Sequence, residues 1–271
     1  MATLGIDVSE FQGRIDWDEV KRDNIHFAIL RAGYGRFQNQ RDRYFERNYR
    51  ETKRIGLPAG AYLFSYATTT EDAREEARNL LRWLEGKEFE YPVYYDMESQ
   101  AQASLSKREL TDVAVAFCEE LERAGYFVGI YASEYWLTNK FEHDRIHPYT
   151  IWLAQYNDRP TYEGDFDMWQ FTSTGTVRGV NGHCDMDYGY EDFPKIIKEN
   201  SLNGFTGRGS STESSDTVRR KPRYRIYTVK SGDTLSGIAS RFGTTWQKLA
   251  KYNRLADPNY LYPGQRLRIP D

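Results

Sequence analysis

Two carboxylates, Asp96 and Glu98, stand two residues apart near the end of a β-branched and aromatic stretch from Tyr91 to Ser99. Because side chains alternate along a strand, we expect both carboxylates, together with Tyr94, on one face. Two like charges at this spacing resist joint ionisation, so one of the two pKa values should rise. Glycosidic bond cleavage uses such a pair, with one carboxyl protonated and the other ionised. An exposed Asp-x-Glu at a loop mouth, without function, is the alternative interpretation.

Strand-like and helix-like patterns alternate through residues 1–199. Apolar alternation predicts strands at residues 4–9, 26–32, 59–66, 91–99, 126–131, 150–156 and 167–171, and apolar stripes predict helices at residues 17–20, 44–55, 69–84 and 106–125. This order predicts a parallel sheet covered by helices. About eight strands in a domain of this length favour a TIM-like (β/α) barrel over an open sheet.

Four acidic residues lie at or near the ends of the expected strands: Asp7, Asp96, Glu98 and Asp185. In a (β/α) barrel the C-terminal strand ends form one rim, where catalytic side chains collect. The spacing therefore predicts that these four residues contribute to one site.

Aromatic side chains near the same strand ends are candidates for substrate binding. Tyr62, Phe64 and Tyr66 share one strand face, either as packed core or as a groove that stacks on sugar rings. Aromatic rings near acids suit sugar stacking, although each could also belong to the core. The predicted substrate-binding residues are Tyr62, Phe64, Tyr131, Trp152, Trp169 and Gln170.

Cys118 and Cys184 lack metal-ligand spacing, and the four histidines form no ligand cluster. We therefore predict neither a metal nor a cofactor, and expect reduced, partly buried thiols; a disulfide between them stays open. No apolar run approaches the length of a membrane span, so membrane insertion is not expected. The start of the sequence lacks the basic head and apolar core of a secretory signal, which favours synthesis in a cytoplasm without a cleaved leader.

The C-terminal part has a different composition. Residues 201–271 carry 13 Lys and Arg against 5 Asp and Glu, whereas residues 1–200 carry 24 against 35. A basic tail suits contact with a polyanion, such as nucleic acid or an anionic cell wall, or it is merely solvated. Ser, Gly and Thr dominate residues 200–223, which predicts a flexible linker. Residues 224–271 then read as strand, helix, helix and strand, a small βααβ domain after a barrel at residues 1–199.

Several segments stand in order across residues 1–195: Gly5-Ile-Asp-Val-Ser-Glu-Phe-Gln-Gly13, Gly60-Ala-Tyr-Leu-Phe64, Tyr95-Asp-Met-Glu98, Trp152-Leu-Ala-Gln-Tyr156 and Gly182-His-Cys-Asp-Met-Asp187. Together they resemble the family-25 glycoside hydrolases, the lysozymes of the Chalaropsis type. One departure is Leu63, where many relatives carry a histidine, and it concerns a substrate-side contact. The C-terminal segments Tyr227-Thr-Val-Lys-Ser-Gly-Asp-Thr-Leu235 and Leu261-Tyr-Pro-Gly-Gln-Arg-Leu-Arg-Ile-Pro270 are similar to a LysM module.

The resemblance implies hydrolysis of the β-1,4 bond between N-acetylmuramic acid and N-acetylglucosamine in bacterial peptidoglycan, with retention assisted by the substrate's acetamido group. It implies Glu98 as the general acid. It implies that Asp96 stabilises the developing positive charge or positions the acetamido group, and that Asp7 and Asp185 bias pKa values and hold substrate hydroxyls. For the LysM-like module it implies sugar binding at Gly232, Asp233, Thr234, Leu235, Asn259, Tyr260 and Leu261.

Peptidoglycan is thus the expected partner of both parts. Nucleic acid is not expected, because the LysM-like pattern accounts for the basic tail. A non-catalytic wall-binding protein and a chitin-directed hydrolase are the alternatives. The missing leader together with a wall-binding module suggests a phage endolysin that reaches the wall after release from the host cytoplasm, or else a bacterial autolysin. The oligomeric state stays open.

Overall fold

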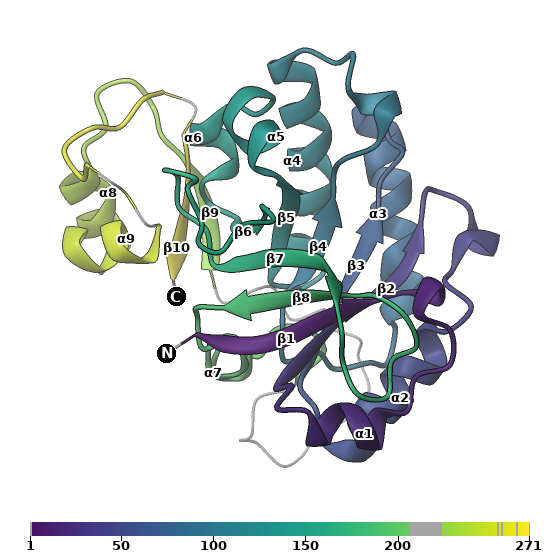
Figure 1. Cartoon of the computed structure of the whole chain (residues 1–271). Coiled ribbons are helices and arrows are strands. Elements are labelled where there is room, and N and C mark those ends of the chain that lie inside the picture. The colour runs from purple at the N-terminus through teal and green to yellow at the C-terminus, as the bar shows by residue number, and fades with distance from the viewer. Residues whose placement is uncertain (1, 206–223, 254, 256, 264, 271) are drawn as a thin grey trace, which may run out of the picture.

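The computed structural model describes residues 2–205, 224–253, 255, 257–263 and 265–270. In residues 2–205, strands close into a barrel in chain order (Figure 1). The strands are β1 (Thr3–Val8), β2 (Phe27–Tyr34), β3 (Ala59–Phe64), β4 (Val93–Asp96), β5 (Val128–Ser133), β6 (Thr150–Ala154), β7 (Met168–Gly175) and β8 (Cys184–Gly189). The predicted TIM-like barrel is confirmed.

Strand β8 departs from the predicted parallel sheet. Strands β1 to β7 run parallel, but β8 is antiparallel to both β7 and β1. The connection from β7 to β8 contains no helix, and a short connection of this kind can join only antiparallel neighbours. Asp185, near the start of β8, pairs with Asp7 on β1. The reversal therefore brings Asp185 to the same rim as the C-terminal ends of the other strands.

Helices cover the part of the barrel formed by the earlier strands, whereas no helix of the described residues covers β7 and β8 (Figure 1). The α-helices are α1 (Trp17–Arg22), α2 (Phe45–Ile55), α3 (Thr70–Leu84), α4 (Lys107–Arg123), α5 (Glu134–Asn139), α6 (His143–Ile146) and α7 (Phe193–Glu199), with 3₁₀ helices η1 (Glu10–Gln12), η2 (Gln38–Gln40) and η3 (Gln100–Gln102). The predicted capping box of Ser106 and Glu109 opens α4.

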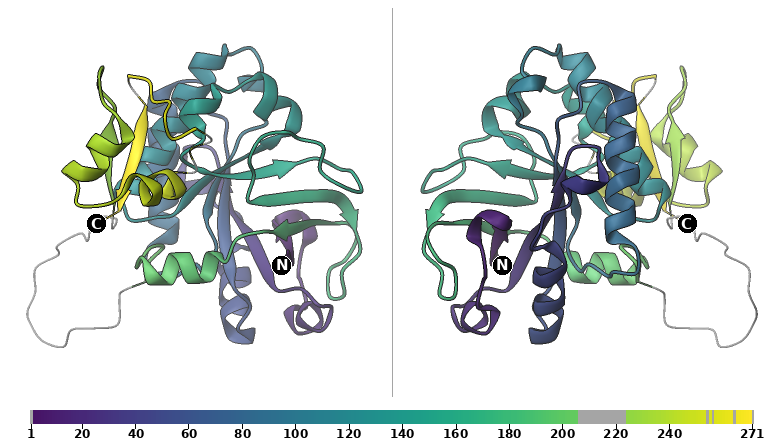
Figure 2. Two further views of the ribbon diagram at one scale, coloured as in Figure 1. Left: turned by 90° about the vertical axis from the view of Figure 1, so that its left-hand side faces the viewer. Right: turned by 90° about the vertical axis from the view of Figure 1, so that its right-hand side faces the viewer.

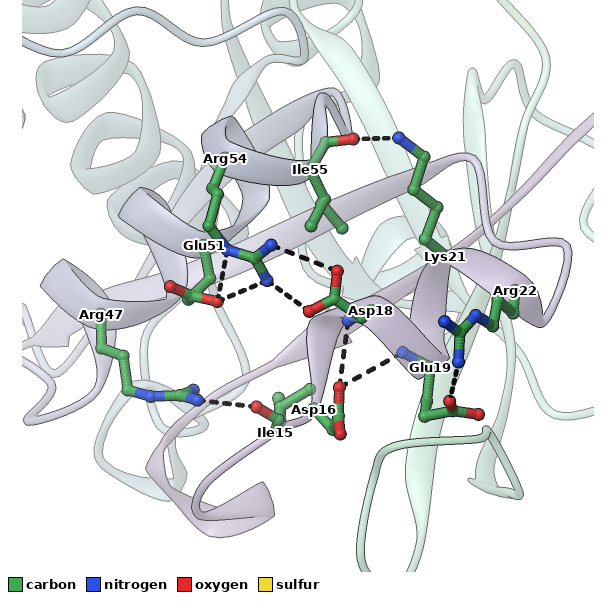
Figure 3. Close-up of polar contacts among 10 residues, drawn as sticks. All are labelled: Ile15, Asp16, Asp18, Glu19, Lys21, Arg22, Arg47, Glu51, Arg54 and Ile55. Atoms are coloured by element: carbon green, nitrogen blue, oxygen red, sulfur yellow. Dashed lines mark hydrogen bonds and ion pairs between the residues drawn. The ribbon is translucent and has the colours of Figure 1, made fainter.

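Charged side chains join α1 to α2 on the outside of the barrel (Figure 3). The carboxylate of Asp16 caps α1 by accepting two backbone N–H groups. The guanidinium of Arg54 binds both carboxylate oxygens of Asp18, at 2.7 and 3.2 Å, and also contacts Glu51. Arg54 and Asp18 are both about half exposed, so water screens this pair.

Aromatic side chains fill the interior of the barrel. Phe27, Tyr94 and Trp152 are almost completely buried there. Helix α7 closes the end of the barrel opposite the rim, where Phe193 joins the same cluster (Figure 2). The same cluster also contains Leu202, which lies beyond residue 199, the predicted end of the barrel.

The predicted linker begins too early at residue 200. Leu202 is buried in the cluster under the barrel, and the side chain of Asn203 bonds the backbone N–H of Phe127 at 2.7 Å and the carbonyl of Tyr91 at 2.8 Å. These contacts satisfy backbone groups at the closed end of the barrel. Residues 200–205 therefore belong to the barrel, and the remainder of the predicted linker, 206–223, lies outside the described residues.

The C-terminal part has the predicted order of elements: β9 (Tyr224–Thr228), α8 (Leu235–Arg241), α9 (Trp246–Tyr252) and β10 (Arg266–Pro270). Strands β9 and β10 pair antiparallel. Leu235, Ile238, Leu249 and Leu267 form the centre of a small separate core.

Within the described residues, Cys118 on α4 and Cys184 on β8 are both buried and form no disulfide. Across the described ranges, no helix combines the length and the apolar character that crossing a membrane requires.

Candidate active site

A cavity of about 550 Å³ opens at the rim where the C-terminal ends of the parallel strands meet. All four predicted acids, Asp7, Asp96, Glu98 and Asp185, line it. They come from β1, from the end of β4 and the residues after it, and from the start of β8. The barrel therefore brings together residues that lie up to 178 positions apart in the sequence.

The backbone after β4 holds Asp96 and Glu98 on one face, as predicted. The carbonyl of Asp96 accepts the N–H of Ser65 at 2.9 Å, and the N–H of Met97 donates to the carbonyl of Tyr131 at 3.0 Å. Met97 is fully buried on the opposite face. Asp96 is also buried, whereas Glu98 is exposed within the cavity, and no hydrogen bond joins its carboxyl to the described residues. Glu98 is thus the carboxyl of this pair that is free to reach a substrate.

Burial raises the pKa values of both carboxyls of this pair. Burial is the larger cause of the raised pKa of Asp96, and the charges of Glu98 and Asp185 add to it. The guanidinium of Arg31 acts in the opposite direction and lowers the pKa of Asp96. Burial likewise raises the pKa of Glu98, although its exposed surface leaves it in contact with water. The cavity therefore favours a proton on this pair at a pH where isolated carboxyls are ionised.

Asp7 and Asp185 face one another across β1 and β8. Burial, followed by the charges of Asp187 and Asp185, raises the pKa of Asp7 well above its usual range. Burial raises the pKa of Asp185 to about 6, and the charge of Glu98 contributes to this shift. These two carboxyls thus extend the acidic surface of the cavity away from Asp96.

Gln170 on β7 organises the polar groups beside Asp7. Its side-chain N–H donates to Oδ2 of Asp7 at 2.7 Å. Its carbonyl oxygen accepts the hydroxyls of Tyr131 and Tyr156, each at 2.9 Å. With all these partners Gln170 has little freedom to rotate, so it fixes the side of the cavity beside Asp7.

Tyr62, Phe64 and Tyr131 line the cavity as predicted, and Gln170 lies beside them. Trp152 also lines the cavity but is only 1% exposed. Its ring packs against Tyr131 at 4.6 Å and Tyr62 at 6.0 Å between ring centroids. Trp152 therefore forms the floor of the cavity and offers almost no surface for stacking on a sugar.

The prediction for Trp169 is wrong. Gln170 points into the barrel, so its neighbour Trp169 must point outward. There Trp169 is buried against Phe171 and Tyr188, and its indole N–H donates to the carbonyl of Gln155 at 2.7 Å. Trp169 is packed core on the outside of β7.

The sequence analysis missed a buried ion pair at the cavity. Arg31 on β2 is 8% exposed and is the cation among the described residues that line the cavity. Its Nε donates to Asp42 at 2.8 Å and its Nη2 to Glu10 at 3.0 Å. A bulge in β2 directly after Arg31 interrupts the register with β3. Such bulges re-aim side chains near active sites.

Exposed aromatic rings at the cavity mouth were also missed. Tyr66 is 50% exposed, Tyr156 is 55% exposed and Phe11 is 81% exposed, and all three line the cavity. The sequence placed Tyr66 on the strand face of Tyr62 and Phe64 as core or groove, but it was not among the predicted substrate-binding residues. Tyr156 lies within the strand predicted at residues 150–156, although the observed β6 ends two residues earlier, whereas Phe11 lies in η1, outside any predicted strand.

In the C-terminal domain, the predicted residues 232–235 mainly shape a turn. Gly232 has a φ of 86°, which favours glycine. Asp233 accepts the hydroxyl of Tyr227 at 2.7 Å, and Thr234 caps α8. The side chain of Leu235 is only 3% exposed and packs in the small core, and sugar binding along residues 232–235 stays a prediction.

The second predicted segment of that domain is more accessible. Tyr260 is 69% exposed, and Asn259 is exposed beside it. Leu261 is half-buried against the small core. Sugar binding at Asn259 and Tyr260 stays a prediction. Among the described residues, no group of three or more His, Cys, Asp or Glu side chains has the arrangement of a metal site.

Comparisons with known proteins agree with this geometry. Residues 6–180 match the family described as glycosyl hydrolases family 25, and residues 227–270 match the LysM domain. The uncharacterized protein YegX of Escherichia coli K12 is 32% identical over 192 residues, which cover 68% of this chain and 68% of YegX.

Solved structures share the barrel. The CTP1L endolysin has a TM-score of 0.65 at 27% identity, with 73% of this chain and 70% of that chain covered. The modular autolysin LytC of Streptococcus pneumoniae, in complex with a synthetic peptidoglycan ligand, has a TM-score of 0.62 at 28% identity and covers 70% of this chain. This chain spans 47% of the LytC chain. From the family match across most of the barrel, the chain belongs to glycosyl hydrolases family 25, as a glycoside hydrolase that carries a LysM domain.

Proposed function

We propose that this glycoside hydrolase cleaves the β-1,4 bond between N-acetylmuramic acid and N-acetylglucosamine in peptidoglycan. The observation that carries the proposal is the pair formed by Asp96 and Glu98 on the cavity wall, one carboxyl buried and the other exposed. Different surroundings are what assign different roles to two carboxyls in glycoside hydrolysis. Glu98 is the general acid, because it reaches the open cavity and its pKa is raised.

In the first step, Glu98 transfers its proton to the glycosidic oxygen while the bond from that oxygen to the anomeric carbon breaks. The carbonyl oxygen of the substrate's own acetamido group then bonds to the anomeric carbon. In the second step, water attacks that carbon, the bond to the acetamido oxygen breaks, and ionised Glu98 takes the proton from water. The net configuration is retained.

Asp96 stabilises the positive charge that develops in both steps and orients the acetamido N–H. Its Oδ1 has no hydrogen-bond partner among the described residues, so that oxygen is not committed to the fold. Asp7 and Asp185 complete the cavity and hold substrate hydroxyls. Tyr66 and Tyr156 offer exposed ring faces at the mouth on which further sugars can stack.

Peptidoglycan as the substrate is supported by two related structures, an endolysin and an autolysin in complex with a synthetic peptidoglycan ligand. The LysM domain gives a second attachment to the same polymer, through exposed residues such as Tyr260. Two attachments on one chain raise the effective concentration of the barrel at the wall. We therefore place the action of the protein at the bacterial cell wall.

Analysis of new reducing ends tests the bond that is cleaved. After digestion of purified peptidoglycan, borohydride reduction should convert muramic acid, and not glucosamine, to its alditol. Glucosaminitol as the product would contradict the proposal. Release of soluble sugars from chitin at a rate equal to that from peptidoglycan would favour a chitin-directed hydrolase instead.

A further inference from the structure

A fifth carboxyl, Asp187 on β8, lies beneath the cavity and has no role in the steps above. It is 0% exposed, and it is not among the residues that line the cavity. Asp187 pairs with Gly5 on β1 and Gln170 on β7, so its side chain points into the barrel beside Asp7. Burying a carboxyl completely is unfavourable unless its oxygens find partners or a proton.

The two oxygens of Asp187 have different surroundings. The indole N–H of Trp152 donates to Oδ1 at 2.8 Å. Oδ2 is buried and has no N–H donor in the part of the chain that the structure describes. The group within hydrogen-bonding reach is the carboxyl of Asp7. Two carboxylates cannot hydrogen-bond each other unless one of them carries a proton.

Within the described part of the chain, the charged groups around Asp187 supply no positive charge to stabilise two carboxylates. Asp7 faces it from β1, and Asp185 lies on its own strand. Among the described residues, the hydroxyl of Tyr94 on β4 and the thiol of Cys184 are the other titratable groups that interact with Asp187. Arg31, the cation at the cavity, is engaged by Asp42 and Glu10.

We propose that Asp187 is a neutral carboxylic acid at neutral pH that donates a hydrogen bond through Oδ2 to Asp7 and thereby fixes Asp7 in the cavity. Asp187 is thus a positioning residue, and its effect on catalysis rests on the proposed function. Asp7 holds the negative charge of this pair because it lines the open cavity and receives the N–H of Gln170. Burial is the largest cause of the raised pKa of each carboxyl, and at Asp187 it outweighs the Trp152 N–H and the contact with Asp7, which lower its pKa.

Two substitutions with the same branched arrangement of side-chain heavy atoms separate a donated hydrogen bond from a negative charge. In Asp187→Asn, the amide can donate to Asp7 and accept from Trp152, so kcat on soluble peptidoglycan should stay within about threefold of the wild-type value. In Asp187→Leu, both hydrogen bonds are lost and Asp7 is free to move, so kcat should fall about 10- to 100-fold with a smaller change in KM. An equal loss of kcat in both variants would show that the negative charge of Asp187 matters and would overturn the proposal. Wild-type kcat in both variants would overturn it as well.

Infrared spectroscopy tests the proton directly and does not depend on catalysis. The difference spectrum between the wild type and Asp187→Asn at pH 7 should contain the carbonyl stretch of a protonated carboxylic acid. Its absence, with a carboxylate band in its place, would overturn the proposal even if the enzyme has the proposed activity. The band would support the proposal even if the cleaved bond proved to be a different one.

Thermal unfolding gives a second readout. An unfolded aspartate loses its proton above a pH of about 4, whereas folded Asp187 keeps it, so this residue destabilises the wild type increasingly as pH rises. The melting temperature of Asp187→Asn minus that of the wild type should therefore increase between pH 4 and pH 7. A difference that stays constant over this range would contradict a neutral Asp187.

Discussion

Replacing Arg31 by methionine should destabilise the barrel strongly. Arg31 makes two charged hydrogen bonds, to Asp42 at 2.8 Å and to Glu10 at 3.0 Å. The side chain of Asp42 is completely buried, so removal of the guanidinium leaves a carboxylate without its counter-charge. Breaking a buried pair from one side costs about 3–5 kcal/mol.

The surroundings of Asp42 favour the lower end of that range. Its carboxylate also accepts the backbone N–H groups of Glu10, at 2.8 Å, and of Tyr44, at 2.9 Å, and both remain in the variant. We therefore expect a loss of about 3 kcal/mol, which lowers the melting temperature of a domain of this size by about 6–12 °C. Arg31 lowers the pKa of Asp96. Its removal should therefore also shift to higher pH the limb of the pH–activity profile that reports ionisation of Asp96.

Arg54→Met is the matched control, measured in the same thermal melts followed by near-ultraviolet circular dichroism. Arg54 also bonds two carboxylates, those of Asp18 and Glu51, but it is 48% exposed (Figure 3). Exposed pairs contribute little to stability, so this variant should melt close to the wild type. Equal decreases of the melting temperature in Arg31→Met and Arg54→Met would refute the reasoning, because burial of the ion pair would then not decide its contribution to stability.

Three further changes test other parts of the account. Trp152→Phe removes the N–H that holds Asp187 and should lower kcat, whereas Trp169→Phe should lower only the melting temperature; initial rates and melts compare the two. Asp185 has a folded pKa of about 6, above the value of about 3.9 for an unfolded aspartate, so the folded state binds more protons and stability falls as pH rises from about 4 to 6. Melts of Asp185→Asn over this range should show a smaller decline. Deletion of residues 206–271 should weaken sedimentation with purified cell wall and leave the melting transition of the barrel unchanged.

Each of these predictions has a contradicting outcome. Equal losses of kcat in the two tryptophan variants would contradict the assignment of Trp152 to the cavity floor and Trp169 to the outer core. A decline with pH that is the same in Asp185→Asn and the wild type would show that Asp185 is not the group responsible. Undiminished wall binding by the shortened chain would exclude the LysM domain as an attachment.

Local periodicity was sufficient to predict the parts of the site that lie along single strands. Alternation placed Asp96 with Glu98 on one face, and the cavity contains both. The same rule, applied to consecutive residues, would have excluded Trp169 from the predicted substrate-binding residues once Gln170 was assigned to the barrel interior. It would also have placed Asp187 on the face of Asp185, two residues earlier.

Contacts between distant elements could not be predicted in this way. The pairing of Arg31 with Asp42 depends on the path of the chain after β2, including a bulge that has no sequence signal. The reversal of β8 depends on a connection without a helix, which the repeating pattern of strand and helix did not anticipate. Asp185 nevertheless reaches the rim, because an antiparallel strand presents its first residues there.

Glu98→Gln tests the central claim most directly, because the amide keeps the size of the side chain and cannot give up a proton. General acid catalysis contributes about 10²- to 10⁴-fold, so the rate at which purified peptidoglycan is cleared should fall by that factor. Sedimentation with the wall should be unchanged, since the LysM domain is intact. Clearing within a few-fold of the wild-type rate would contradict the assignment of Glu98 as the acid and, with it, the account of the site.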